Sequence, residues 1–135
     1  MLTGGCHCGA IRYELNGDPV AHLLCHCSDC QRTSGAPMVG WIMITDDCLT
    51  VTGEPAIYAS SESGKRYFCI QCGTGLFYSN EVNLPGMVDI QSATLDEPST
   101  AQPSAHIQIA DQISWMQNAH ELPKFDRWPD EEDQG

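Results

Sequence analysis

The chain has 135 residues and a mass of 14.8 kDa, a size typical of one domain with a single hydrophobic core. Eighteen acidic residues against six basic ones give a net charge of −12, so a surface for nucleic acid or for an anionic membrane is not expected. No run approaches the ~18 to 20 apolar residues that cross a bilayer. Met1 to Gly5 contains neither a basic segment nor an apolar run, so no signal peptide is expected. We therefore expect a cytoplasmic protein whose thiols stay reduced.

Short extended segments separated by Gly and Pro predict a mainly β fold with little helix. Ala10 to Leu15 alternates apolar and polar residues, which predicts a strand, and Asn16-Gly17 predicts a hairpin turn after it. Val20 to Leu24 predicts a strand that leads into a cysteine cluster, and one helical turn is expected at 27–34. Further extended segments are expected at 38–44, 49–51, 57–58, 65–69, 73–78, 87–91 and 105–110. We expect residues 1–128 to form one domain and 129–135 to form an acidic tail.

Seven of the eight cysteines lie in three short clusters, and Cys48 stands alone. Close cysteine pairs in a reducing compartment indicate metal binding more than disulfides. Disulfides and metal-free reduced thiols remain alternatives. The clusters are Cys6 and Cys8; Cys25, Cys27 and Cys30; and Cys69 and Cys72.

The two outer clusters predict one structural zinc site with the ligands Cys6, Cys8, Cys69 and Cys72. Zinc in structural sites takes four ligands, commonly as two close pairs, because a tight turn brings two thiolates to one ion without strain. Such a site closes a loop of about sixty residues and staples the N-terminal segment to the second half of the fold.

The central cluster, Cys25, Cys27 and Cys30, predicts a second zinc with an open coordination position, which is typical of a catalytic site. The alternative is that Cys48 or His26 closes this site into a purely structural one. A side chain between two ligands of a CxC motif usually points away from the shared ion, so His26 is expected outside the ligand set. The spacing does not match the usual iron–sulfur motifs, which favours zinc.

Tryptophans and isolated histidines are expected to have ordinary packing roles. Trp41, Trp115 and Trp128 are expected in the core or in a lid. His106 is expected to be a surface or packing residue, and Cys48 a small buried hydrophobe.

Three segments, GGCHCGAIRYEL, CHCSDCQRTSGAP and CIQCGTGLF, together resemble the glutathione-dependent formaldehyde-activating enzyme family, which includes centromere-protein-V-like members. The resemblance runs from about Thr3 to Tyr78, and ISWMQNAHELPKF is similar to the family's C-terminal Trp and Pro elements. It implies small stacked sheets that carry two zincs. By this resemblance the structural ligands are Cys6, Cys8, Cys69 and Cys72, and the catalytic ones are Cys25, Cys27 and Cys30.

The activity that the resemblance implies is addition of glutathione to formaldehyde, giving S-hydroxymethylglutathione, and it is classed with carbon–sulfur lyases. The expected partners are glutathione or a similar thiol and a small aldehyde. Three cysteinates weaken the acidity of an ion, so we favour presentation of the thiolate over activation of the carbonyl. Arg32 is the best-placed cation for a glutathione carboxylate, with Lys65 and Arg66 behind it. The alternative function is a non-enzymatic zinc module that binds a protein partner.

Overall fold

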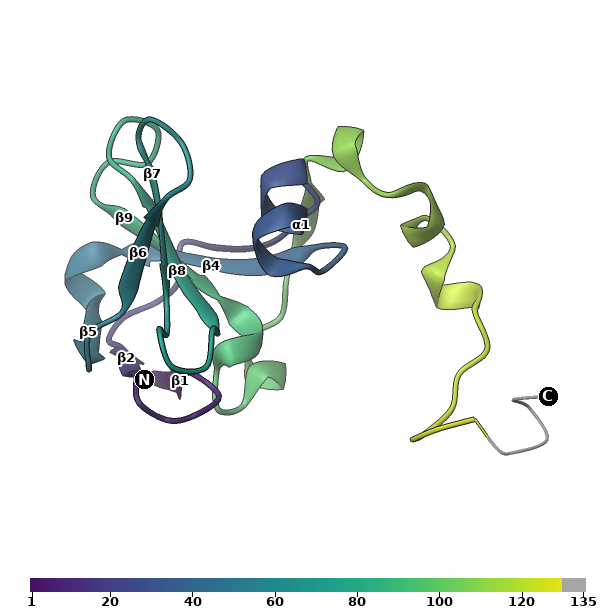
Figure 1. Cartoon of the computed structure of the whole chain (residues 1–135), viewed down its shortest axis with the longest axis horizontal. Coiled ribbons are helices and arrows are strands. Elements are labelled where there is room, and N and C mark those ends of the chain that lie inside the picture. The colour runs from purple at the N-terminus through teal and green to yellow at the C-terminus, as the bar shows by residue number, and fades with distance from the viewer. Residues whose placement is uncertain (130–135) are drawn as a thin grey trace.

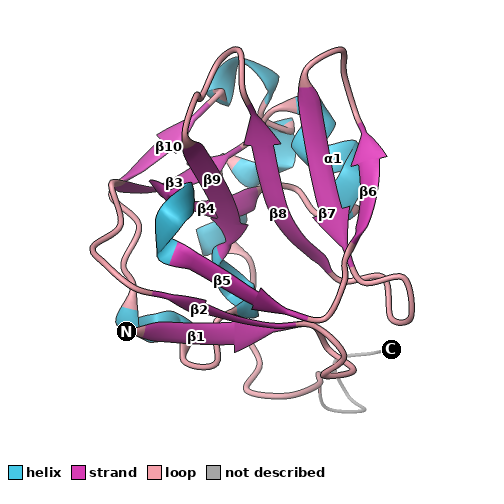
Figure 2. Cartoon of the chain, turned by 90° about the vertical axis from the view of Figure 1, so that its left-hand side faces the viewer, coloured by secondary structure: helices cyan, strands magenta, loops and turns pink. Residues whose placement is uncertain are grey.

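Two β-sheets, one short α-helix and a C-terminal arm make up the computed structural model, which describes residues 1–129 (Figure 1, Figure 2). The smaller sheet has the strand order β1-β2-β5, and the larger has the order β10-β3-β4-β9-β8-β7-β6. The prediction of a mainly β fold with little helix is confirmed. The elements are β1 (Leu2–Gly5), β2 (Arg12–Leu15), β3 (Ala21–Cys25), α1 (Ser28–Ser34), β4 (Val39–Thr45), β5 (Leu49–Thr52), β6 (Ala56–Ala59), β7 (Gly64–Phe68), β8 (Gly75–Asn80), β9 (Met87–Gln91), β10 (Ala105–Ile107) and 3-10 turns at Asp46–Cys48, Ser92–Thr94, Pro98–Thr100, Ile109–Asp111, Ser114–Met116 and Ala119–Glu121.

The three-stranded sheet is built around β2, whose alternating sequence buries Tyr13 and Leu15 and exposes Arg12 and Glu14. β2 pairs in antiparallel fashion with β1 on one side and β5 on the other. The predicted hairpin at Asn16-Gly17 is wrong, because β3 follows this turn but belongs to the other sheet. A turn sequence fixes where the chain reverses, whereas the partner of β2 is set by which apolar faces meet.

The hydrophobic core lies between the three-stranded sheet and one face of the seven-stranded sheet. Ile42, Ile90 and Phe77 lie side by side across β4, β9 and β8, and all three are buried. The ring of Tyr13 from β2 meets Phe77 edge-on, with 5.4 Å between the ring centroids. Leu15 on the same face of β2 is fully buried as well. The core therefore joins the two sheets face to face.

The opposite face of the seven-stranded sheet carries a row of larger and polar side chains. Met43 on β4 lies opposite Asp89 on β9, Asp89 lies opposite Tyr78 on β8, and Tyr78 lies opposite Arg66 on β7. Trp41, two residues before Met43, is on the same face because side chains alternate along a strand. Figure 1 shows α1 beside β4 at one end of this sheet. This face provides the wall for a site beside α1.

β10 joins the sheet next to β3 and forms the only parallel strand pair within residues 1–129. The segment predicted as extended, 105–110, forms a strand only as far as Ile107 and then turns into the 3-10 turn Ile109–Asp111. Gln108 between them has a φ of 58°, a left-handed conformation that a non-glycine residue rarely adopts. The side chain of Gln31 in α1 donates to the Asp111 carbonyl at 3.0 Å. The end of β10 is thus tied to the helix.

Residues 112–129 form an arm that leads away from the sheets, coloured yellow-green to yellow in Figure 1. Trp41 is buried in the core, whereas Trp115 and Trp128 are 59% and 83% exposed and lie outside it, so for these two only the predicted role in a lid stays a prediction. No helix within the described residues is long and apolar enough to cross a membrane. The predicted acidic tail lies outside the described residues from position 130 onward, and the single domain at 1–128 stays a prediction.

Candidate metal centres

Four thiols come together from two turns that are distant in the sequence, one between β1 and β2 and one between β7 and β8. Their sulfur atoms all lie within 4.8 Å of one another: Cys6, Cys8, Cys69 and Cys72. The Sγ atom of Cys8 is 3.7 Å from that of Cys6 and 3.7 Å from that of Cys69. Four sulfurs at about 2.3 Å from one zinc ion lie about 3.8 Å apart in a tetrahedron. The observed spacing therefore fits a four-thiolate zinc site.

Each pair of thiols is held by a tight turn that ends in a glycine. Gly9 follows Cys8 with a φ of 84°, and Gly73 follows Cys72 with a φ of 81°, conformations that favour glycine. The Gly73 amide donates to the Cys69 carbonyl at 2.8 Å, which closes the second turn. The Ile11 amide donates to Cys6 Sγ at 3.2 Å. The turns therefore direct polar groups at the sulfurs, as a metal knuckle requires.

The surroundings of this cluster favour the thiolate at Cys6 and Cys72 but not at Cys8. A hydrogen bond from the Ala10 amide works to lower the pKa of Cys8, but burial and the neighbouring thiols outweigh it and raise the pKa to about 11. Hydrogen bonds from Thr74 lower the pKa of Cys72 to about 5. Burial works to raise the pKa of Cys6, but the Ile11 amide and the neighbouring thiols outweigh it, so the pKa is lowered. A metal ligand must be deprotonated, so a cluster with stabilised thiolates is suited to a divalent cation.

Three thiols form the second cluster, at the point where β3 ends and α1 begins. The sulfur atoms of Cys25, Cys27 and Cys30 lie within 4.8 Å of one another. Cys25 is the last residue of β3, and Cys27 caps α1 by accepting a hydrogen bond from the Cys30 amide at 3.3 Å. Within residues 1–129, no fourth Cys, His, Asp or Glu joins this group. The predicted alternatives, Cys48 and His26, are not members of it.

Burial makes two of these thiols, those of Cys25 and Cys30, poor acids in the absence of a cation. Burial raises the pKa of Cys25 to about 12 and also raises the pKa of Cys30. The indole N–H of Trp41 donates to Cys30 Sγ at 3.4 Å, which favours a charged sulfur at that position. A buried thiol trio of this kind is converted to thiolates by a bound metal ion, whose charge offsets the cost of burial. The donor set fits zinc by its softness and spacing.

A cavity of about 370 Å³ opens directly onto the three thiols. Cys25, Cys27 and Cys30 form part of its lining, together with Trp41 and Tyr78, whose ring centroids lie 6.1 Å apart. None of the thiols of the four-thiol cluster lines this cavity. The two clusters thus differ both in the number of thiols and in their access to this cavity.

Arg66, which the sequence analysis placed behind Arg32 as a cation for the substrate, and Asp89, which it did not single out, also line the cavity. The guanidinium of Arg66 lies 5.0 Å from the centroid of the Tyr78 ring, and its Nε atom is buried without a hydrogen-bond partner in the described structure. Burial raises the pKa of Asp89 to about 6. Only strand register could have identified these residues, because they lie about 40 and 60 residues after the thiols in the chain.

Arg32, the predicted cation for the substrate, lies in the last turn of α1 and is exposed. It does not line the thiol cavity but lines a neighbouring groove of about 550 Å³. Arg66 lines both spaces. The cavity and the groove therefore adjoin at the side chain of Arg66.

The histidine inside the three-thiol motif points away from the thiols. His26 is fully buried, and its Nε2 atom lies 2.8 Å from Nδ1 of His106 on β10. The His26 amide donates to the Ile107 carbonyl at 3.1 Å. The sequence analysis correctly placed His26 outside the ligand set but missed its partner, because a hydrogen bond across 80 residues leaves no local signal.

Residues 1–111 match the sequence model of the glutathione-dependent formaldehyde-activating enzyme family. The chain therefore belongs to this family, and the resemblance of its three cysteine motifs is confirmed. A protein of Halomonas elongata, named provisionally as a glutathione-dependent formaldehyde-activating enzyme, is 27% identical over 143 residues, which cover 97% of this chain and 90% of the relative.

Two further similarities cover less of this chain. An uncharacterized lyase of Schizosaccharomyces pombe is 28% identical over 76 residues, which cover 56% of this chain and 56% of the relative. The crystal structure of a Rhodobacter sphaeroides protein, a structural genomics target, has a TM-score of 0.61 and is 24% identical, covering 77% of this chain and 98% of that chain. This last similarity shows the shared fold.

Proposed function

We propose that the protein is a zinc-dependent carbon–sulfur lyase that adds glutathione, or a similar thiol, to formaldehyde or another small aldehyde. The observation that carries this proposal is the contrast between the two clusters. Four thiols form a set complete for a structural zinc, whereas three thiols on a cavity wall leave a position for a substrate. Membership in the family and the provisional name of the Halomonas relative support the same activity.

We assign Cys25, Cys27 and Cys30 as ligands of the catalytic zinc, and Cys6, Cys8, Cys69 and Cys72 as ligands of the structural zinc. Zinc bound by three thiolates supplies positive charge that favours the deprotonated form of a substrate thiol. In the addition, the thiol loses its proton, its sulfur bonds to the aldehyde carbon, and the carbonyl oxygen gains a proton. No oxidant or reductant is required.

Arginines along the cavity and groove suit a thiol that carries carboxylates, as glutathione does. Arg66 stands at the boundary of the two spaces, and its Nε–H is directed at no partner within residues 1–129. Arg32 lines the groove farther out. We infer that the sulfur of glutathione lies at the thiol cluster, one carboxylate binds Arg66, and a second carboxylate reaches Arg32.

Asp89 is positioned to move the proton in this reaction. Its carboxyl group shares the cavity with the thiols, and burial raises its pKa to about 6, near the value that suits a group that both takes and gives a proton. We infer that the Asp89 carboxylate accepts the proton of the substrate thiol and returns it to the aldehyde oxygen. The burial of Asp89 would thereby support proton transfer while it lowers the stability of the folded protein.

The test combines metal content with exchange kinetics. We expect two zincs per chain in the intact protein and one in Cys27→Ser, and glutathione should perturb the visible spectrum only of the intact, cobalt-substituted protein. Exchange between ¹³C-formaldehyde and its glutathione adduct, followed by NMR, should be accelerated by the intact protein and by Cys48→Ser, the matched control outside both clusters. Cys27→Ser should not accelerate it. Two metals that ignore glutathione, with no acceleration, would overturn the proposal.

The second candidate function is a zinc module that binds a protein partner. The exposed apolar arm is the observation that favours it. It predicts that a fourth ligand from outside residues 1–129 or from a partner completes the three-thiol site, so glutathione would leave the cobalt spectrum unchanged.

We place the protein in the cytoplasm, a proposal supported by eight cysteines that are all free thiols.

A further inference from the structure

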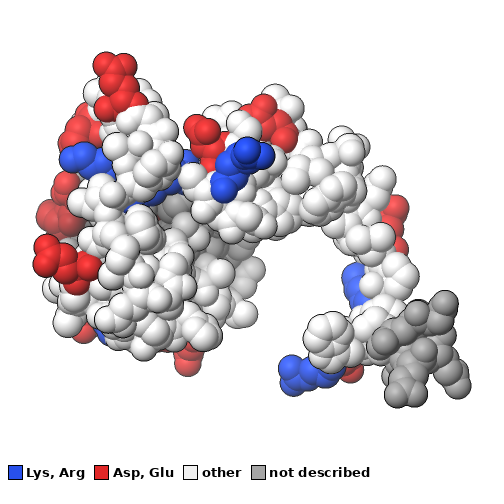
Figure 3. Space-filling view, viewed as in Figure 1, with Lys and Arg blue, Asp and Glu red and all other residues white. Residues whose placement is uncertain are grey.

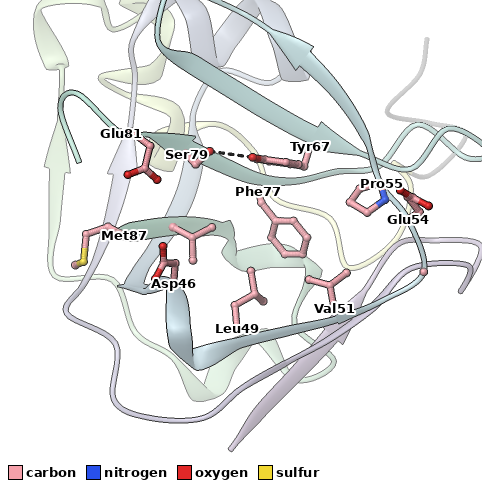
Figure 4. A pocket seen from close by; sticks show the side chains of 12 residues that line it. Asp46, Leu49, Val51, Glu54, Pro55, Tyr67, Phe77, Ser79, Glu81 and Met87 are labelled. Atoms are coloured by element: carbon pink, nitrogen blue, oxygen red, sulfur yellow. Dashed lines mark hydrogen bonds between the residues drawn. The ribbon is translucent and has the colours of Figure 1, made fainter. Parts of the chain in front are cut away.

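A cavity of about 660 Å³ lies away from both thiol clusters, between the two sheets (Figure 4). Its floor is apolar, with Leu49 and Val51 from β5 facing Phe77 from β8. Tyr67 and Ser79 close one wall through a hydroxyl–hydroxyl hydrogen bond of 3.1 Å. We call this space the intersheet pocket.

Carboxylates surround the opening of the intersheet pocket. Figure 4 shows Asp46 and Glu81 toward one end of the pocket and Glu54 at the other, with the apolar floor between them. All three carboxylates are exposed. An occupant of this pocket therefore needs an apolar centre and basic groups on both sides of it.

The arm, residues 112–129, offers a segment with that chemistry. Lys124 and Arg127 lie on either side of Phe125 and Asp126, and Trp128 follows, so the segment carries two cations and one carboxylate and has a net charge of +1. These two cations are a third of the six basic residues of the chain, whereas residues 1–111 hold four basic and twelve acidic ones. Figure 3 shows the basic side chains of the arm with acidic side chains close to them, and further acidic side chains on the body. The segment 124–128 and the pocket are complementary in charge and in apolar character.

The arm carries large apolar side chains that are exposed to solvent in the single chain. Leu122, Phe125 and Trp128 are 61%, 46% and 83% exposed, within seven consecutive residues. The hydrogen bonds of the arm are local, such as the one from the Leu122 amide to the Ala119 carbonyl at 3.2 Å. A contiguous exposed apolar segment of this kind marks an interaction site.

We propose that two copies of this chain exchange arms, with Phe125 of one copy in the intersheet pocket of the other. Trp128 covers the mouth of the pocket, and Lys124 and Arg127 meet Glu81 and Glu54. The arm leads away from its own pocket (Figure 1), so the occupant is a second copy. A twofold arrangement buries four aromatic rings at about 150–250 Å² each, and their neighbours bring the interface toward the ~1,200 Å² of stable complexes.

The acidic run Asp130-Glu131-Glu132-Asp133 follows this segment directly in the sequence. Its charge opposes an approach to the carboxylates of the pocket. Replacing the run with Asn and Gln is therefore expected to tighten the dimer by several fold. No change, or weaker association, would contradict the charge pairing.

Charge reversal provides the decisive experiment, read by light scattering coupled to size exclusion. The intact chain should have twice the 14.8 kDa mass at micromolar concentration. Lys124→Glu with Arg127→Glu, and separately Glu54→Lys with Glu81→Lys, should each give monomers. An equimolar mixture of the two variants should restore a dimer, because each arm then meets a pocket of opposite charge. An arm that docks in its own pocket cannot give this result.

The controls separate docking from folding. The control variant Glu14→Lys with Glu62→Lys changes the net charge by the same amount as Glu54→Lys with Glu81→Lys. Its two positions are exposed and do not line the pocket, so the dimer should stay intact. Metal content and circular dichroism of every variant should equal those of the intact chain. An intact chain that is monomeric up to 100-fold higher concentration, a dimer that survives Phe125→Ala with Trp128→Ala, or a mixture that stays monomeric would each overturn the proposal.

Discussion

At the scale of single residues, the buried carboxyl group of Asp89, the proposed proton carrier, costs stability. Burial raises its pKa to about 6 from an ordinary 3.8, so the folded protein binds this proton more tightly than the unfolded chain. Stability therefore falls as pH rises from about 4 to about 6, and the loss is complete above the folded pKa. Asp89→Asn removes this penalty.

We expect Asp89→Asn to be more stable than the intact protein at pH 7 by about 1 to 3 kcal/mol, while its rate of thiol–aldehyde exchange falls by about 10²-fold or more. Thermal melts at pH 4 and pH 7, beside NMR exchange kinetics, check both effects. The stability gain should vanish at pH 4, where both forms are neutral. Reduced stability at pH 7, or unchanged exchange, would show that Asp89 has another role.

The pair His26 and His106 supports a prediction about packing alone. Nδ1 of His26 is buried without a partner in the described structure, and only Nε2 is satisfied, by His106 at 2.8 Å. His106→Ala leaves both nitrogens without a protein partner and should cost about 1–2 kcal/mol in the free energy of unfolding, measured by urea denaturation. His106→Asn, which can still donate or accept a hydrogen bond, should recover part of the loss. Equal stability of all three proteins would mean that water replaces this contact.

The residues that the sequence could and could not reveal differ in a physical way. The thiols of both clusters were predictable because CxC and CxxC spacing is local and metal coordination demands it. The sequence analysis named Arg66 only as a cation behind Arg32 and did not single out Asp89, because the place of both residues depends on the register of β7, β8 and β9 and on which face each side chain takes. The sequence analysis selected Arg32 by proximity in the chain, whereas the structure places it in the adjoining groove.

At the scale of elements, the four-thiol cluster joins the turn between β1 and β2 to the turn between β7 and β8. The first turn connects two strands of the three-stranded sheet, and the second connects two strands of the seven-stranded sheet, so the cluster links the two sheets. The three-thiol cluster, by contrast, lies within one neighbourhood of β3 and α1. Loss of a metal should therefore have unequal consequences at the two sites.

Cys69→Ser is expected to lower stability by roughly 3 kcal/mol or more, since metal binding at a structural site contributes directly to folding. Cys27→Ser should also lose one metal but lower stability by about 1–2 kcal/mol, because it removes one helix cap and a local site. Metal analysis paired with urea denaturation measures both, and Cys48→Ser serves as the control. If Cys27→Ser were the less stable of the two, the division between structural and catalytic sites would be reversed.

The strands were largely predictable, but their partners were not. Alternation and Gly/Pro breaks placed β2, β3, β4 and β9 within a residue or two of their observed bounds. The parallel pairing of β10 with β3 joins segments about eighty residues apart, and no short-range pattern specifies it. The error at Asn16-Gly17 has the same origin, because the turn is local whereas sheet membership depends on the whole core.

At the scale of the whole molecule, the net charge of −12 acts on both folding and association, with opposite results. Within one chain the carboxylates outnumber the cations and repel one another, so screening of this repulsion by salt should stabilise the folded state. Between an acidic pocket and a basic arm segment the charges attract, so screening should weaken the contact.

We therefore expect the melting temperature of the monomeric variant Lys124→Glu with Arg127→Glu to rise by several degrees between about 0.01 M and about 1 M NaCl, as the Debye length falls from about 30 Å to about 3 Å. Over the same range the Kd of the dimer of the intact chain should rise by about tenfold, because salt screens the attraction between arm and pocket. Differential scanning calorimetry and sedimentation equilibrium measure the two trends separately. A melting temperature that falls with salt would mean that local ion pairs such as Arg12 with Asp96 outweigh the general repulsion. A dimer that tightens with salt would mean that apolar burial alone holds the arms, because salt strengthens apolar association while it screens charge.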